Sequence, residues 1–140
     1  MRDELQIRVA FQPRRAGWID SREVSLIVNG RALLELTGGG DLGGLSPAEL
    51  PPSDHLLGRP NEHLALAGRS ALLICPECGD LGCGAVLARI EVGPDVVTWT
   101  DLVHGNTLEP DHGPIACRFT FDRDAYERDL KRAAELTRLR

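Results

Sequence analysis

The sequence predicts one α+β domain over residues 1–140: an antiparallel sheet built from hairpins, a C-terminal helix packed on it, and a long loop rich in glycine and proline. Three observations predict this class. Short segments alternate apolar and polar residues, as half-buried strands do. Turn residues separate these segments in pairs, which is typical of hairpins. The final segment carries its apolar residues at helical spacing instead. The length suits a single domain.

The first predicted hairpin lies in the N-terminal part of the chain. Residues 6–11 alternate apolar and polar side chains, which indicates a half-buried strand. Residues 23–28 form a second such segment, and residues 31–36 follow as its expected return strand. Asn29-Gly30 stands between these two segments. This dipeptide favours a type I′ turn, in which both positions need a positive φ, so we expect a hairpin here.

Residues 37–61 form the predicted long loop, with six glycines and four prolines. Loops of this length inside a compact domain tend to be mobile or functional, and we expect this one to be mobile. One helical turn is expected where Ser46 can act as a cap, Pro47 as the first helical residue and Glu49 as the partner of a capping box. The two histidines nearby, His55 and His63, are expected at the surface.

The second predicted hairpin follows a short buried strand over residues 71–75. Residues 85–92 and 96–103 alternate in the manner of strands, and the turn-forming residues 93–95 join them. Trp99 is expected in the core, and Asp101 is expected to cap the end of its strand.

The C-terminal part of the chain is predicted to form one strand and one helix. Residues 115–121 alternate, so that Ile115, Cys117, Phe119 and Phe121 share a face. Asp122 suits a helix cap, and the helix is expected over residues 122–139. Its buried stripe comprises Tyr126, Leu130, Ala133 and Ala134.

The cysteine loop, residues 75–84, is the most informative segment for function. Cys75 and Cys78 have the spacing that lets two thiolates bind one tetrahedral ion, and Cys83 is near enough to be a third ligand. A structural zinc site needs a fourth ligand, which Cys117, His104 or His112 could supply. Zinc is the one cofactor that the sequence suggests, and these residues are the candidate metal ligands.

Two other interpretations of the same loop stay open. The pattern Cys-Pro-x-Cys resembles the active-site loop of glutaredoxin-like proteins, in which a helix N-terminus stabilises the first thiolate. In a thiol-based redox protein or switch, Cys75 or Cys78 would attack, and the other cysteine or Cys83 would resolve the intermediate. However, the glycines of this loop disfavour a helix after Cys75. Alternatively, the cysteines are only small buried side chains.

Composition excludes several classes of partner. The net charge of −5 and the pI of about 5.3 argue against binding to nucleic acid or to an anionic membrane surface. The chain has no run of ~18 apolar residues that could span a bilayer. Its first residues lack the apolar stretch of a signal peptide, so we expect a cytoplasmic protein. A protein partner of unknown identity is compatible with this composition, which leaves the oligomeric state open.

Several short motifs in a fixed order resemble those of a group of small, uncharacterised actinobacterial proteins. The resemblance extends from about Val24 onward and implies a shared fold, but no activity. The motifs are Val28-Asn29-Gly30-Arg31, Pro51-Pro52-Ser53, Leu56-Leu57-Gly58, Cys78-Gly79-x-x-Gly82-Cys83, Val97-x-Trp99-x-Asp101 and Phe121-Asp122-Arg123-x-x-Tyr126.

The sequence has no catalytic motif that we recognise. It contains neither the Gly-x-Ser-x-Gly turn of serine hydrolases nor a phosphate-binding loop with its lysine. The first hypothesis is therefore a non-enzymatic binding or accessory module with a cysteine knuckle that can hold structural zinc. The alternative is the thiol-based redox protein described above.

Overall fold

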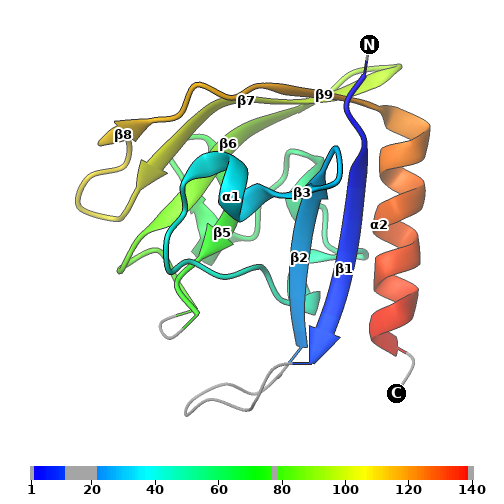
Figure 1. Cartoon of the computed structure of the whole chain (residues 1–140), viewed down its shortest axis with the longest axis horizontal. Coiled ribbons are helices and arrows are strands. Elements are labelled where there is room, and N and C mark those ends of the chain that lie inside the picture. Colours follow the sequence, from blue (N-terminus) through cyan, green and yellow to red (C-terminus); the bar gives the residue numbers. More distant parts are fainter. Residues whose placement is uncertain (1, 12–21, 77–78, 139–140) are drawn as a thin grey trace.

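The computed structural model describes residues 2–11, 22–76 and 79–138, and it confirms the predicted α+β class. Figure 1 shows β1 beside β2, with α2 alongside β1 and with β5 and β6 on the other side of β2. The strands are β1 (Leu5–Phe11), β2 (Arg22–Val28), β3 (Arg31–Ala32), β4 (Ala65–Leu66), β5 (Arg69–Ile74), β6 (Ala85–Val92), β7 (Val96–Gly105), β8 (Gly113–Pro114) and β9 (Phe119–Asp122). The α-helices are α1 (Leu33–Thr37) and α2 (Arg123–Arg138), and three short 3-10 helices are η1 (Pro47–Glu49), η2 (His55–Leu57) and η3 (Glu62–Leu64).

The first hairpin forms at the predicted turn, but its return strand is short. Asn29 and Gly30 both have positive φ, of 53° and 81°, as a type I′ turn requires. The prediction of a strand over residues 31–36 is wrong, because only Arg31–Ala32 pairs with β2. The following residues form α1, in which Thr37 Oγ1 donates to the Leu33 carbonyl at 2.8 Å. Leucine and glutamate, which dominate this segment, are good helix formers.

The second hairpin, β6 with β7, also forms where the sequence predicts it, but β7 contains a bulge. Leu87 pairs with Val103 and Arg89 pairs with Thr100, so β7 has one extra residue between these pairs. Asp101 sits there with a φ of 55° and an exposed side chain, while Trp99 is fully buried as expected. Because the strand continues to Gly105, the prediction that Asp101 caps its end is wrong.

The bulge places Asp101 where it can hold a buried arginine of β5. Arg69 donates from Nε to the Asp101 carbonyl at 2.9 Å and from Nη2 to the Asp101 carboxylate at 2.8 Å. Only 10% of the Arg69 side chain is exposed, and Arg89 approaches the same carboxylate at 3.6 Å. The charge of Arg69 is therefore compensated within the sheet, which burial of a guanidinium requires.

The strand predicted over residues 115–121 forms only at its C-terminal end, and the prediction is wrong for residues 115–118, which belong to no strand. Residues 119–121 belong to β9, which pairs with Val96–Trp99 of β7, whereas β8 comes just before the predicted strand and pairs with Val103 and His104. The bulge lies between these two stretches of β7, so a single straight partner strand cannot stay in register across it. The predicted alternation persists nevertheless, since Phe119 and Phe121 are buried and Ile115 and Cys117 pack against the core.

The strands form two sheets, one of β1, β2 and β3 and the other of β4 to β9. Further hydrogen bonds connect these two sheets into a ring. The segment 43–45 lies between them: Leu45 exchanges two backbone hydrogen bonds with Val24 of β2, and Gly43 exchanges two with Ile74 of β5. At the other side, Asp3 forms a parallel bridge with Phe121 of β9. The order around the ring is β1, β2, segment 43–45, β5, β6, β7, β9 and back to residue 3.

The long loop over residues 37–61, which we expected to be mobile, is packed against this ring. The predicted capping box forms, because Ser46 N donates to Glu49 Oε1 at 2.8 Å and the Ser46 hydroxyl accepts from Ala48 N. Leu45, Leu50 and Leu56 are each at most 2% exposed. Burial of these leucines stabilises one arrangement of the loop, despite its many glycines and prolines.

Helix α2 covers the ring with the four residues that the sequence predicts, Tyr126, Leu130, Ala133 and Ala134. Asp122 caps it, since Ala125 N donates to Asp122 Oδ2 at 3.1 Å. The helix is described to Arg138, and the predicted last residue, 139, lies outside the described residues. No helix in the described part of the chain is both long and apolar enough to cross a membrane.

An aromatic cluster joins α2 to the sheet. The ring of Trp99 packs edge-on against Phe121, at 4.8 Å between centroids, and against Tyr126, at 6.2 Å. Trp99 Nε1 donates to the Tyr126 hydroxyl at 3.1 Å, and that hydroxyl donates to the Leu56 carbonyl at 2.5 Å. Complete burial raises the pKa of Tyr126, so its hydroxyl stays a donor at neutral pH.

We expect Gly44→Ala to destabilise the protein by about 3 kcal/mol, because the new Cβ would lie 2.2 Å from the Val24 carbonyl oxygen and would separate segment 43–45 from β2. Gly93→Ala is the matched control, since its Cβ would meet the nearest atom at 3.4 Å. Urea unfolding of both variants measures the difference. Equal stability of the two variants would contradict a ring closed through segment 43–45.

We expect Tyr126→Phe to lower the free energy of unfolding by about 1–3 kcal/mol, because it leaves the Trp99 N–H and the Leu56 carbonyl buried without their partner. Leu136→Ala on the same helix serves as a control for a half-exposed side chain and should cost less than about 1 kcal/mol. Denaturant unfolding followed by circular dichroism compares the two. A Tyr126→Phe variant as stable as the wild type would show that water replaces both hydrogen bonds.

Candidate functional site

The cysteines that were predicted as metal ligands in the cysteine loop are not all free thiols. Cys75 follows β5 directly and is a half-buried free thiol. Cys83 is disulfide-bonded, and Cys78 lies outside the described residues. A sulfur atom in a disulfide is not a thiolate, so zinc binding by this loop requires a reduced Cys83.

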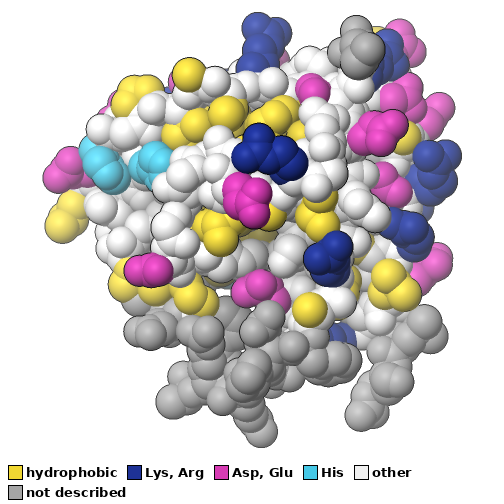
Figure 2. Space-filling model, viewed as in Figure 1, with side chains coloured by type: hydrophobic (Ala, Val, Ile, Leu, Met, Phe, Trp, Pro, Cys, Tyr) yellow, Lys and Arg dark blue, Asp and Glu magenta, His cyan; other side chains and the backbone are white. Residues whose placement is uncertain are grey.

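The three candidates for the fourth ligand lie near the connection between β7 and β9. Cys117 Sγ donates to the Leu36 carbonyl at 3.6 Å, and His104 Nε2 donates to the adjacent Thr37 carbonyl at 2.9 Å. His112 is exposed just before β8, where Figure 2 shows histidine side chains beside acidic and hydrophobic ones. Among the described residues, no three His, Cys, Asp or Glu side chains are grouped to hold a metal ion.

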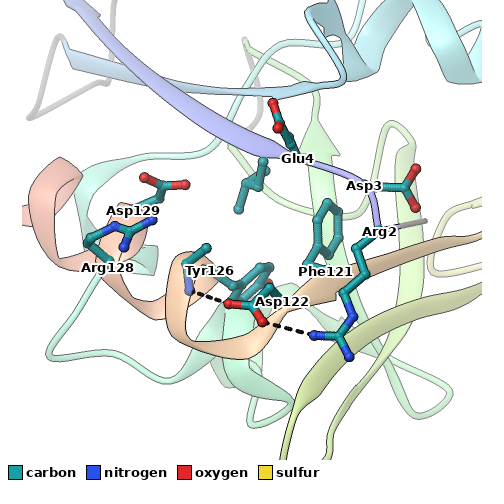
Figure 3. Close-up of a pocket in the computed structure, with 10 residues that line it drawn as sticks. Arg2, Asp3, Glu4, Phe121, Asp122, Tyr126, Arg128 and Asp129 are labelled. Atoms are coloured by element: carbon teal, nitrogen blue, oxygen red, sulfur yellow. Dashed lines mark hydrogen bonds and ion pairs between the residues drawn. The ribbon is translucent and has the colours of Figure 1, made fainter.

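A hollow that the sequence analysis did not predict lies between the N-terminal segment and α2. We call this the N-terminal hollow; its volume is about 400 Å³. Figure 3 shows the residues around it, with Phe121 and Tyr126 between the charged side chains of the two walls. Its apolar floor consists of Leu5, Phe121, Ala125 and Tyr126, and its charged rim consists of Arg2, Asp3, Glu4, Asp122, Arg128 and Asp129.

The N-terminal wall of the hollow is held in place on both sides. Asp3 N donates to the Thr120 carbonyl at 2.7 Å, and Thr120 N donates back to Asp3 Oδ2 at 2.8 Å. Asn29 Nδ2 donates to Asp3 Oδ1 at 2.9 Å, and Glu4 N donates to Asn29 Oδ1 at 2.9 Å. These bonds attach residues 3 and 4 to β9 and to the β2–β3 turn, so the wall does not depend on a ligand.

The rim of the hollow carries both signs of charge. Arg2 crosses from the N-terminal wall to Asp122, with 2.8 Å between Nη1 and Oδ1, and both side chains are about half exposed. Within the described residues, Arg128 and Glu4 form no ion pair, and Asp129 forms an ion pair with Arg132, with 3.9 Å between Oδ1 and Nη2. Two arginines and four acids therefore surround a floor of buried and half-buried apolar side chains.

His55 is buried, although we expected it at the surface. Its side chain is fully enclosed, with Nε2 donating to the Ala71 carbonyl at 2.7 Å and Nδ1 accepting from Asn61 N at 3.0 Å. Both bonds require the neutral tautomer with the proton on Nε2. Burial is the main cause that lowers the pKa of His55 from its usual 6.5.

Little in the sequence could have revealed the hollow or the buried histidine. The hollow needs residue 3 beside residue 121, and no local pattern predicts a contact across that distance. The one available signal was the predicted cap at Asp122, which fixes where α2 begins beside the hollow.

The chain matches no protein-family model, no curated protein and no solved structure.

Proposed function

We propose that this protein is a non-enzymatic binding module and that its N-terminal hollow receives a small zwitterion. The observation that carries this proposal is the rim, where two arginines and four acids surround an apolar floor. A volume of about 400 Å³ lies within the usual range for small-molecule sites. A ligand with an ammonium group, a carboxylate and a short apolar chain between them would match both parts of this surface.

The exposure of the Arg2–Asp122 ion pair supports the proposal that a ligand can bind to Arg2 at the rim. An ion pair with half-exposed side chains contributes at most about 1 kcal/mol, so a ligand carboxylate can take the place of Asp122 beside Arg2 at low cost. Arg128 offers a second guanidinium on the facing wall, and the acids offer sites for the ammonium group. The buried floor would contact the apolar chain of the ligand.

The environment of His55 supports a structural role rather than acid–base catalysis for this residue, because both of its ring nitrogens form hydrogen bonds within the fold. A general base must instead present a free lone pair to its substrate.

The net charge of −5 supports a further part of the proposal, that neither nucleic acid nor an anionic membrane surface is the partner. We also propose a cytoplasmic location and allow for a protein partner.

We expect 6-aminohexanoate to bind with a Kd on the order of 1 mM, and hexanoate and hexylammonium to bind more weakly, because each of these carries only one of the two charges. NMR titration should show shifts at residues of the hollow, including Leu5, Ala125 and Arg128. Arg128→Gln should weaken binding about fivefold, the effect of losing one exposed ion pair.

Lys131→Gln is the matched control, since it removes one positive charge from the same helix outside the hollow and should leave the affinity unchanged. Shifts confined to other surfaces, or no shifts with any of the three compounds, would show that the hollow is not the site. Equal affinities for hexylammonium and 6-aminohexanoate would overturn the proposal that the ligand is a zwitterion.

We further propose that the cysteine loop, when reduced, holds structural zinc through Cys75, Cys78 and Cys83. The fourth ligand stays open between Cys117, His104 and His112. Cys75 supports this role, because it is a free thiol directly after the buried strand β5. Zinc there would tie the end of β5 to the start of β6.

A thiol-based redox protein or switch is the second candidate, and the disulfide of Cys83 favours it. Cytosolic thiol pools reduce most disulfides, so in a cytoplasmic protein this bond would be reversible. A thiol reductant would supply two electrons and two protons, and Cys83 would then become a thiol. Cys75 is the nearby free thiol that could attack the same disulfide in an exchange reaction.

Elemental analysis and thiol titration of the protein, purified in mild reductant without chelator, separate these candidates. The zinc knuckle predicts about one zinc per chain and thiols that react only after chelation or unfolding. The redox candidate predicts no metal and two thiols that oxidise reversibly. Cys83→Ser should abolish either behaviour, whereas Cys117→Ser should abolish only zinc binding, and only if Cys117 is the fourth ligand.

A further inference from the structure

His55 connects the long loop to the sheet. Through Nε2 it donates to Ala71 of β5, and through Nδ1 it accepts from the backbone of Asn61. The Ser53 hydroxyl accepts from His55 N at 3.1 Å and donates to Asn61 Oδ1 at 2.6 Å. The imidazole of His55 thus bonds β5 and Asn61, while the backbone amide of the same residue bonds Ser53 at the other end of the segment 53–61.

The same network extends to the start of the loop. The Asn61 amide donates to the Ala48 carbonyl at 3.1 Å and to Glu49 Oε2 at 3.3 Å. Glu49 is itself 2% exposed and accepts from Ser46. Since Leu50, Leu56 and Leu64 lie in the core between these polar groups, the segment 46–64 is ordered by a set of bonds that converges on His55 and Asn61.

Protonation of His55 is incompatible with this arrangement. A protonated imidazole carries a proton on Nδ1, and that proton would face the N–H of Asn61, where no acceptor is available. The positive charge would also be enclosed, since none of the side chain is exposed. Of the charged groups on the elements packed around it, Glu49 of η1 favours protonation and His63 of η3 opposes it.

The balance of these effects gives the direction of the pH dependence. Burial has the largest effect and lowers the pKa of His55, whereas the Ala71 carbonyl and Glu49 raise it by less. Because the pKa in the folded state lies below the unfolded value of 6.5, the contribution of His55 to stability is complete above about pH 6.5. It is lost as the pH falls through the folded pKa.

We propose that His55 is a proton-controlled latch, which fastens the segment 46–64 to β5 when neutral and releases it when protonated. The latch does not require a bound ligand. It is nevertheless connected to the N-terminal hollow through one hydrogen bond. Leu56, the next residue, accepts the hydrogen bond of Tyr126, and Tyr126 forms part of the floor of the hollow. Release of the segment would therefore remove one restraint on that floor.

Amide hydrogen exchange by NMR at pH 7.5, 6.0 and 5.0 tests the latch in the wild-type protein. The amides of Leu50, Leu57 and Leu64, which are hydrogen-bonded within the segment, report its release. Their protection factors, corrected for intrinsic rates, should fall by up to about tenfold per pH unit as the pH drops from 6.5 toward the folded pKa, because in that range the released form binds one proton more than the fastened form. Amides of Ile90 and Trp99 in the β6–β7 ladder should lose less. An equal loss at both sets of amides, or no loss at the segment, would overturn the latch.

Two variants assign the effect to His55. His55→Gln can donate to Ala71 and does not titrate, so segment protection should no longer depend on pH. His63→Gln removes the neighbouring exposed imidazole and should leave the dependence intact. Loss of the dependence in His63→Gln would overturn the assignment. If His55→Gln does not fold, nitrogen chemical shifts of the wild-type ring decide, because they give the folded pKa of His55. Segment protection must fall between pH 6.5 and that pKa, and titration of the ring without such a loss would contradict the proposal.

Discussion

The hydroxyl group of Tyr126 is the point at which the separate parts of this fold meet. It accepts a hydrogen bond from Trp99 of β7 and donates one to Leu56 of the long loop, while its own residue belongs to α2. A helix, a strand and a loop are therefore fixed relative to one another by a single buried group. The ring of Tyr126 also forms part of the floor of the N-terminal hollow, so the proposed binding surface depends on the same contact.

Buried polar groups determine how the chain closes around this point. In the described part of the chain, every buried side-chain nitrogen or oxygen has a hydrogen-bond partner. His55, Glu49 and Arg69 are the instructive cases, because each is nearly enclosed and each bonds a segment distant in sequence. An unpaired group at any of these positions would cost about 1–3 kcal/mol, so these bonds select one arrangement of loop and sheet rather than merely adding stability.

The two proposed functional regions differ in what they require of the protein. The N-terminal wall of the hollow is held by hydrogen bonds that the backbone amides of Asp3, Glu4 and Thr120 donate, and it exists without a ligand. The cysteine loop instead carries a disulfide at Cys83, and the proposed zinc site would need that disulfide to be reduced. Metal binding and disulfide formation compete for that sulfur atom, so the redox state of the cell would decide which of them takes place.

The sequence by itself determined the local structure. The Asn29-Gly30 turn, the β6–β7 hairpin, the capping box at Ser46 and the buried stripe of α2 all depend on residues close together in the chain, and all formed as predicted. Their physical causes, such as the φ values of a turn or the period of a helix, act within a few residues.

Only the tertiary structure decided the ring, the bulge at Asp101, the burial of His55 and the N-terminal hollow. Each of these needs contacts between segments distant in sequence: Asp3 with Phe121, Arg69 with Asp101, His55 with Ala71, and Arg2 with Asp122. The polarity of one residue does not reveal whether a distant carbonyl or carboxylate will compensate its burial. For this reason the candidate site could not be predicted from the sequence, although most of the elements around it could.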